Sequence, residues 1–222
     1  MYLPRDIVSG DFYYLAEKNQ KIILGLADCT GHGVPGAFMS SLGISILNSV
    51  IASNDEPAKI LKELDLNLTK SLHQESGEDA NNGLEISLLV IDKSERKIQF
   101  ASANRPIWLT IDGDEAYEIA PTSKESIGII KKSAEKVYKN VDICFQKSIQ
   151  VFAYSDGFQD QFGGEKNKKL SKKRFYELLN ETLKQPFEIQ KAFLQKKYEE
   201  WKGTEPQLDD VSVISFRIYA QT

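Results

Sequence analysis

Five aspartates lie where apolar stretches of the sequence begin or end, and their type and spacing could do chemistry. They are Asp11, Asp28, Asp156, Asp209 and Asp210. A single aspartate at such a place often only accepts hydrogen bonds from nearby backbone amides. Several together, with Gly10, Gly31 and Gly157 beside them, favour a shared cation site at the ends of strands.

The spacing of the first two aspartates supports this interpretation. The runs 11–15 and 21–27 predict two strands, and Asn19-Gln20 between them suits the left-handed backbone of a tight hairpin turn. Residues equally distant from that turn face each other, which sets Asp11 opposite Asp28. Facing side chains have Cβ atoms about 4.5–5.5 Å apart, and two carboxylates there share a proton or bind a cation.

The ligand types select the class of metal. His32, His73, Cys29 and Cys144 form no group at zinc-ligand spacing, so the candidate ligands are carboxylate oxygens. Such ligands favour hard ions, Mg²⁺ or Mn²⁺. The two widely separated cysteines fit a reducing compartment, and we expect a cytoplasmic protein.

Composition excludes several classes of partner. The 222 residues carry a net charge of −4, whereas a protein that binds nucleic acid needs a basic face. No apolar run approaches the roughly 18 residues of a membrane span, and the N-terminus has no secretion signal. We therefore expect no nucleic acid and no membrane contact.

The elements that must position the aspartates follow from periodicity and turn residues. Strands are predicted at 11–15, 21–27, 84–91, 97–101, 107–111, 137–145, 149–154 and 211–218, helices at 34–52, 57–72, 171–183 and 188–201, and a loop at 76–83. The first helix is predicted from Phe38, Leu42, Ile46 and Val50, which recur every fourth residue. Runs of strands interrupted by helix pairs indicate an α+β domain, with antiparallel sheets inside and helices outside. No repeat or linker divides residues 1–222, so one domain is predicted.

Four motifs contain these aspartates. They are Ser9-Gly10-Asp11-Phe12-Tyr13, Asp28-Cys29-Thr30-Gly31-His32-Gly33-Val34-Pro35-Gly36-Ala37, Tyr154-Ser155-Asp156-Gly157 and Asp209-Asp210-Val211-Ser212-Val213. In this order they resemble the SpoIIE/RsbU-like branch of the PPM-type (type 2C) metal-dependent serine/threonine phosphatases, over essentially the whole chain. Asp160-Gln161-Phe162-Gly163-Gly164 and Glu200-Trp201-Lys202-Gly203 resemble a subgroup that is usually attached to sensor or repeat domains.

The resemblance implies a four-layer αββα sandwich, two packed antiparallel sheets flanked by helices, with a binuclear Mn²⁺ or Mg²⁺ centre at one end. Asp11 and Asp28 would be the catalytic bridging ligands, and Cys29 would contribute its backbone carbonyl. Asp156 and Asp209 would each hold one metal, with Asp210 as the alternative in the final pair. A metal-activated water would then hydrolyse phosphoserine or phosphothreonine on a bacterial signalling partner.

Three further positions have open roles. His32 is either a proton donor to the leaving serine oxygen or a turn residue that orders the metal loop. Arg5 is either a ligand of the substrate phosphate or a surface arginine. Where the subgroup often has Asp-Gly-Met-Asp, this chain has Asn82-Gly83-Leu84-Glu85, which opens the question of any third metal or substrate contact there.

The expected partner is a phosphoprotein, with an anti-sigma-factor antagonist as the candidate. We expect the catalytic part of a longer protein, with an upstream sensor domain, a homodimer as one assembly, and a preceding segment that gates the site by moving Asp11. One alternative is a catalytically silent regulatory binding module, and another is a phosphatase of small molecules. The presence of every ligand-type aspartate favours an enzyme.

Overall fold

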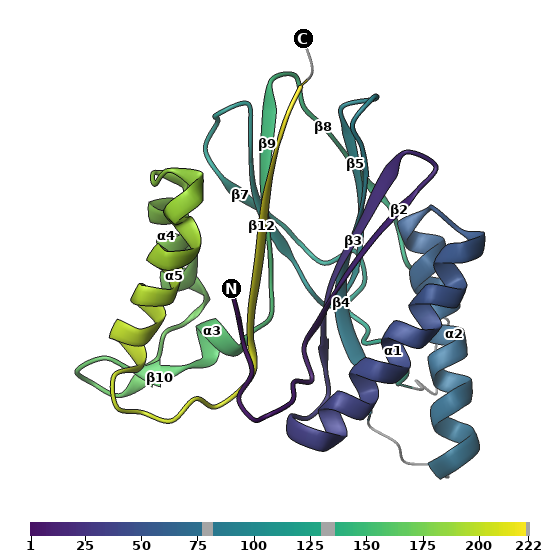
Figure 1. Cartoon of the computed structure of the whole chain (residues 1–222), viewed down its shortest axis with the longest axis horizontal. Coiled ribbons are helices and arrows are strands. Elements are labelled where there is room, and N and C mark those ends of the chain that lie inside the picture. The colour runs from purple at the N-terminus through teal and green to yellow at the C-terminus, as the bar shows by residue number, and fades with distance from the viewer. Residues whose placement is uncertain (77–81, 130–135, 221–222) are drawn as a thin grey trace.

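Two five-stranded antiparallel sheets pack face to face, and a pair of helices covers the outer face of each (Figure 1). The computed structural model describes residues 1–76, 82–129 and 136–220. One sheet has the order β1-β12-β9-β6-β7 and the other the order β2-β3-β4-β5-β8. The predicted four-layer αββα sandwich is confirmed.

The element bounds agree with the predicted ranges to within a few residues for most elements. The first sheet contains β1 (Tyr2–Leu3), β12 (Val211–Tyr219), β9 (Ser148–Tyr154), β6 (Ile107–Ile111) and β7 (Tyr117–Ile119). The second contains β2 (Phe12–Lys18), β3 (Lys21–Cys29), β4 (Leu84–Asp92), β5 (Lys97–Ala103) and β8 (Val141–Cys144). The helices are α1 (Gly33–Ser53), α2 (Pro57–Ser76), α3 (Gly157–Asp160), α4 (Lys172–Leu183) and α5 (Phe187–Lys202), and β10 (Phe162–Gly163) pairs with β11 (Lys168–Lys169).

The differences from the predicted elements are confined to short or irregular pieces. The strand predicted at 137–145 is shorter, and β1, β7, α3, β10 and β11, each of two to four residues, were not predicted. Elements this short carry no period of their own and depend on their neighbours. Most of the loop predicted at 76–83 lies outside the described residues.

The centre of the second sheet is buried on both faces. In β3, Ile23 and Ala27 pack in the layer below α1 and α2, whereas Leu24 and Leu26 pack between the two sheets. Alternation of side chains along a strand produces this division. A strand with helices on one side and a second sheet on the other must be apolar throughout, as the sequence of β3 predicts.

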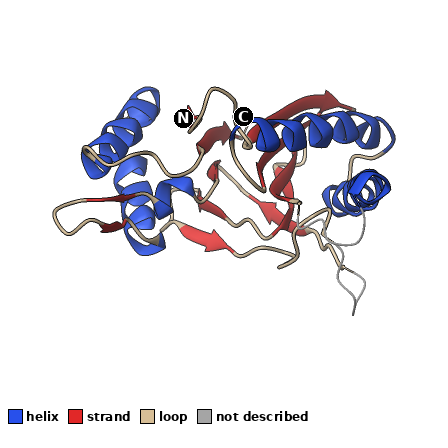
Figure 2. Ribbon diagram, turned by 90° about the horizontal axis from the view of Figure 1, so that it is seen from below, coloured by secondary structure: helices blue, strands red, loops and turns tan. Residues whose placement is uncertain are grey.

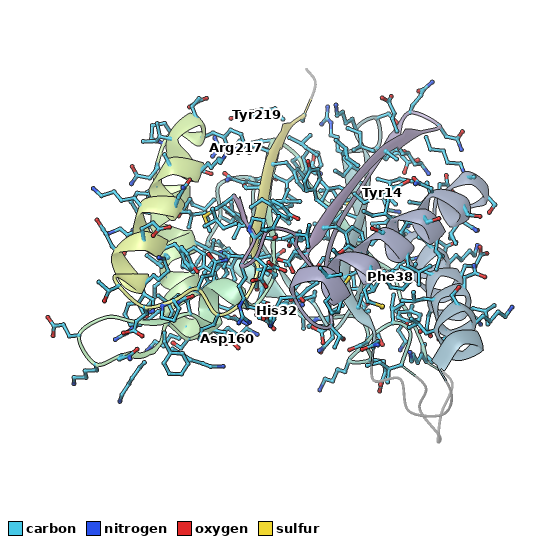
Figure 3. The ribbon with its side chains drawn as sticks, turned by 60° about the horizontal axis from the view of Figure 1, so that its bottom comes forward. Tyr14, His32, Phe38, Asp160, Arg217 and Tyr219 are labelled. Carbon is cyan, nitrogen blue, oxygen red and sulfur yellow. The ribbon has the colours of Figure 1, made fainter. Side chains whose placement is uncertain are left out.

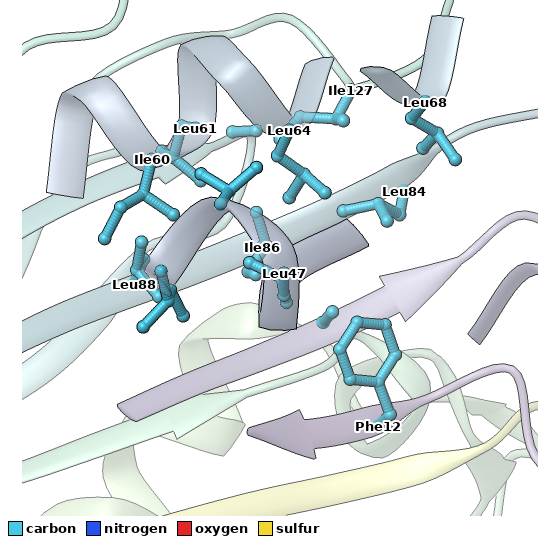
Figure 4. Packing of buried hydrophobic residues seen from close by; sticks show 14 of the residues in the cluster. Phe12, Leu47, Ile60, Leu61, Leu64, Leu68, Leu84, Ile86, Leu88 and Ile127 are labelled. Atoms are coloured by element: carbon cyan, nitrogen blue, oxygen red, sulfur yellow. The ribbon is translucent and has the colours of Figure 1, made fainter. Parts of the chain in front are cut away.

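Helix α1 needs a correction to the expected absence of a long apolar segment. By length and composition it could cross a membrane, but here Met39, Leu47 and Val50 are buried in the cluster that includes α2 and β4 (Figure 4). In this fold one face of α1 packs on the sheet while the other is exposed. Its buried face differs in part from the predicted stripe, because Phe38 is 58% exposed.

The layers leave one end of the molecule for chemistry. Strands β3 and β9 finish at the same end, and each leads there into a helix, α1 and α3 (Figures 1 and 2). The aromatic cluster below α4 and α5, which includes Trp108, Phe152 and Tyr198, fixes the sheet behind α3.

Candidate metal centre

Three acidic residues lie side by side across β2, β3 and β4. The β2–β3 register pairs Phe12 with Ala27, which continues to Asp11 opposite Asp28. The turn contains Asn19 at φ 51° and Gln20 at φ 63°, so the predicted hairpin and its register are confirmed. On the other side of β3, the register pairs Asp28 with Glu85.

The other sheet brings two more aspartates to the same end. Asp156 follows β9 and directly precedes α3, and Asp209 lies just before β12. The antiparallel pairing of Tyr154 with Val213 holds these two strand ends together. Burial raises the pKa of Asp209, and the charges of Asp156 and Asp210 raise it further, whereas a backbone hydrogen bond from Asp210 and the nearby His32 lower it.

Glycines allow the loops that carry these aspartates to touch through their backbones. A Cβ on Gly10 or on Gly36 would overlap the carbonyl oxygen of Gly31, and a Cβ on Gly157 would overlap that of Asp210. Any larger residue would push the loops apart. The glycines beside the aspartates are therefore part of the geometry of the site.

Asp11 lies at the most enclosed point of this acidic centre. It is 2% exposed, and its Oδ2 has no hydrogen-bond partner among the described residues. Burial raises its pKa to about 7; the Ser212 and Ser155 hydroxyls oppose this, and the charge of Asp210 adds to it. Burial likewise raises the pKa of Asp28 well above its usual range, against the lowering effect of Arg105.

Arg105 is a residue of the acidic centre that sequence reasoning missed. It is 8% exposed and lies between β5 and β6, the strands that connect the two sheets. Its Nη2 donates to Asp28 Oδ2 at 2.5 Å and to Asp156 Oδ2 at 3.0 Å, and its Nε lies 2.9 Å from Glu85 Oε2. The available signal was that Arg105 is the single charged residue between Lys97 and Asp112.

The last two aspartates have different surroundings. Asp210 accepts hydrogen bonds from the backbone amides of Arg5 and Gly10, each at 2.7 Å, so its carboxylate holds the segment before Asp11. Asp209 instead accepts the amide of Asp210 at 2.8 Å on Oδ1 and lies within the electrostatic reach of Asp156. Asp209 is therefore the better placed of the two to bind an ion.

His32 and Arg5 lie at the rim of the acidic centre. His32 Nδ1 lies 2.9 Å from Asp6 Oδ2, and His32 is half-exposed at the start of α1 (Figure 3). The exposed guanidinium of Arg5 donates to the carbonyl of Leu208 at 2.9 Å. Cys29, by contrast, has a buried thiol whose pKa is raised by burial.

The two subgroup motifs form a second cluster behind the site, the Gln161 cluster, made of Gln161, Tyr198, Trp201, Pro206 and Leu208. Gln161 Nε2 donates to the carbonyls of Phe162 and Pro206, and its Oε1 accepts from the Tyr198 hydroxyl and the Leu208 amide. Trp201 Nε1 donates to the Gln161 carbonyl at 3.0 Å. This cluster fixes α3 after Asp156 and the segment before Asp209.

The donor set fits hard divalent ions in composition. All the candidate groups are carboxylate or carbonyl oxygens, and Asp11 Oδ2 is buried with no hydrogen bond from the residues that the structure describes, as expected of a ligand atom. Within the described ranges, however, no three His, Cys, Asp or Glu side chains already converge as a group able to hold an ion. The guanidinium of Arg105 lies between Asp28 and Asp156 instead.

Two packed sheets with an acidic centre at this end define the PP2C class of phosphatase domain. The PP2C domain of SiaA from Pseudomonas aeruginosa has this fold, with a TM-score of 0.86 and 30% identity over 98% of this chain and 84% of that chain. Residues 18–219 match the family described as Stage II sporulation protein E (SpoIIE). The chain belongs to the SpoIIE family, which confirms the resemblance found in its motifs.

Two further relatives show how far the similarity extends. Phosphoserine phosphatase RsbU from Bacillus subtilis (strain 168) is 24% identical over 156 residues, which is 70% of this chain and 44% of RsbU. This chain thus spans less than half the length of that relative. RsbX, solved in complex with magnesium, shares the fold with a TM-score of 0.64 and 15% identity, over 97% of this chain and 90% of that chain.

Proposed function

We propose that this chain is a metal-dependent protein phosphatase that hydrolyses phosphoserine or phosphothreonine on another protein. Oδ2 of Asp11, which is buried and has no hydrogen-bond partner among the described residues, carries the proposal, because a bound cation would stabilise a carboxylate kept away from water beside other acids. Asp11, Asp28, Asp156, Asp209 and the backbone carbonyl of Cys29 would hold Mn²⁺ or Mg²⁺ ions. When bound, such ions activate a water and neutralise charge on the phosphoryl oxygens.

The other residues would position these ligands and manage protons. Asp210 fixes the backbone before Asp11 through the amides of Arg5 and Gly10. Asp6 holds the His32 ring through Nδ1, so Nε2 is the atom able to give a proton to the departing serine oxygen. The Arg5 guanidinium, which lies beside Leu208, is the cation at the rim that can attract the substrate phosphate.

The substrate is proposed to be a phosphoprotein of a bacterial signalling system in the cytoplasm, of the anti-sigma-factor-antagonist type. The name of RsbU, a phosphoserine phosphatase, supports the phosphoserine part of this assignment. An upstream sensor domain and a homodimer would belong to the full-length protein. The competing function, a silent binding module, shares the fold, but would not need a buried, unpartnered carboxylate.

Hydrolysis of p-nitrophenyl phosphate tests the proposal. We expect no turnover in excess EDTA and full recovery when Mn²⁺ is added in excess over the chelator. Full activity in chelator would overturn metal dependence, and metal binding without turnover would favour the silent module. A second assay, with a phosphoserine peptide and a small phosphate ester at equal concentration, separates a protein phosphatase from an enzyme of small molecules.

A further inference from the structure

Arg105 occupies a position that a divalent cation would need. We propose that Arg105 is an internal cation that holds Asp28 and Asp156 together in the metal-free protein, and that metal binding displaces its guanidinium from them. The inference rests on the proposed function, because it concerns the metal ligands assigned there. It gives Arg105 a positioning role that none of the motifs in the sequence reveals.

The geometry carries the first step. A single nitrogen, Nη2, donates to Oδ2 of Asp28 at 2.5 Å and to Oδ2 of Asp156 at 3.0 Å. These carboxylates belong to different sheets, and both are candidate metal ligands. A small divalent ion holds its oxygens at about 2.0–2.1 Å, so the nitrogen and an ion cannot lie between the same two oxygens.

The surroundings of Arg105 allow Nη2 to move away from the two aspartates while the backbone and inner side chain of Arg105 stay in place. Nε forms an ion pair with Glu85 Oε2 at 2.9 Å but has no hydrogen bond to any described group, and Glu85 Oε1 accepts a hydrogen bond from Asn104 Nδ2. The backbone is fixed too, since Ser87 Oγ donates to the Arg105 carbonyl at 3.3 Å. Rotation about the outer side-chain bonds can therefore release Nη2 from both aspartates without moving the β5–β6 connection.

Charge explains why the residue is present. Asp28, Asp156 and Glu85 bring three carboxylates to one buried guanidinium, and an unpaired buried charge is costly. Arg105 therefore stabilises the metal-free fold. The same charge-assisted hydrogen bonds must break before an ion can bind, so Arg105 should weaken the affinity for metal. A residue with only a structural role would have the opposite effect on affinity, because its loss would disorder the ligands.

The test measures metal binding and stability, without turnover. Wild type, Arg105→Gln and Arg105→Lys are titrated with Mn²⁺ by calorimetry, and their melting temperatures are recorded in EDTA. Arg217→Gln is the matched control, because Arg217 is also partly buried and bonded, to Gln150, at the far end of β12. Arg217→Gln should change neither the affinity for Mn²⁺ nor the effect that a substitution of Arg105 has on that affinity.

We expect Arg105→Gln to melt lower than wild type in EDTA yet to bind Mn²⁺ at least about tenfold more tightly, with Arg105→Lys intermediate. If Arg105→Gln does not fold without metal, Arg105→Lys decides by the same criterion. Unchanged or weaker Mn²⁺ binding in the folded variants would overturn the inference. Failure of wild type and both variants to bind Mn²⁺ at all would instead overturn the proposed metal site.

Discussion

The acidic centre and the Gln161 cluster lie at the same end of the molecule but differ in how far their buried polar atoms are hydrogen-bonded. Gln161 is 1% exposed and uses both its side-chain donors and accepts two hydrogen bonds on Oε1. Asp11 is almost equally buried, but its Oδ2 has no partner in the described part of the chain. The side chain of Gln161 thus has all its hydrogen bonds, whereas the acidic centre leaves one buried carboxylate oxygen without a hydrogen bond from any described residue.

The difference teaches how the domain divides stability from function. A buried amide with all its hydrogen bonds rigidifies its surroundings, and Gln161 fixes the segments next to Asp156 and Asp209. Buried carboxylates that repel one another cost stability and create affinity for ions. The Gln161 cluster therefore adds to Arg105 in holding the acidic centre in place.

The largest expected effect is on turnover. Asp28→Asn and Asp156→Asn should each lower kcat at least about 1,000-fold, or about 4 kcal/mol of activation free energy, because each removes a charged ligand and almost no volume. Steady-state kinetics at saturating Mn²⁺ measure this, with circular dichroism to confirm folding. The matched control is Asp160→Asn, which removes an exposed aspartate paired with Lys169 at the same end. Wild-type turnover by either ligand variant would contradict its assignment.

The second effect is a pH dependence of stability without metal. The pKa of Asp11 is about 7 when folded against an ordinary 3.8, so the folded state binds this proton more tightly than the unfolded state. Stability should then fall as pH rises from about 4 to about 7 and stay low above, by up to about 4 kcal/mol from this group. Asp11→Asn should lose this contribution and be the more stable protein in EDTA at pH 8.

Urea unfolding of wild type and Asp11→Asn in EDTA, at pH 5 and pH 8, separates the contribution of Asp11 from that of the other titrating groups. The difference in unfolding free energy between the two proteins should widen toward pH 8. Parallel pH profiles would show that Asp11 keeps an ordinary pKa. Charge repulsion would then not distinguish the acidic centre from the Gln161 cluster.

The third effect belongs to the Gln161 cluster. Gln161→Leu should lower the unfolding free energy by about 2–4 kcal/mol, because the buried Tyr198 hydroxyl and its neighbours lose their partners. Gln159→Leu is the control, since Gln159 Oε1 has no hydrogen-bond partner in the structure as described. Chemical denaturation measures both variants, and equal, small losses would show that the hydrogen bonds of Gln161 contribute nothing specific.

The smallest effect is expected where the two regions meet. The exposed Arg5 guanidinium bonds the Leu208 carbonyl, whereas Asp210 is held by the Arg5 backbone amide, which any residue supplies. Arg5→Gln should therefore raise KM by about 3- to 5-fold, or about 1 kcal/mol, and leave kcat and the fold unchanged. Phosphopeptide kinetics measure this. A loss above about 100-fold would make Arg5 a main ligand of the phosphate.

Local sequence determined the hairpin and the strands around the centre. Two residues able to adopt left-handed backbone, Asn19 and Gln20, fix the β2–β3 turn, and a fixed turn sets every pair along the ladder, including Asp11 opposite Asp28. The apolar run of β3 likewise determined burial on both faces. Such features depend on neighbours within a few residues, so periodicity and turn chemistry suffice to find them.

Only the tertiary structure decided which charged groups meet. Arg105 is 77 positions from Asp28 and 51 from Asp156 in the sequence, and no local pattern reports that the β5–β6 connection crosses between the sheets at the acidic centre. The different surroundings of Asp209 and Asp210 are equally non-local, because Asp210 is bonded by the amides of Arg5 and Gly10 near the other end of the chain. Electrostatic partners are set by distance in space, and packing of the two sheets is what brings these charges together.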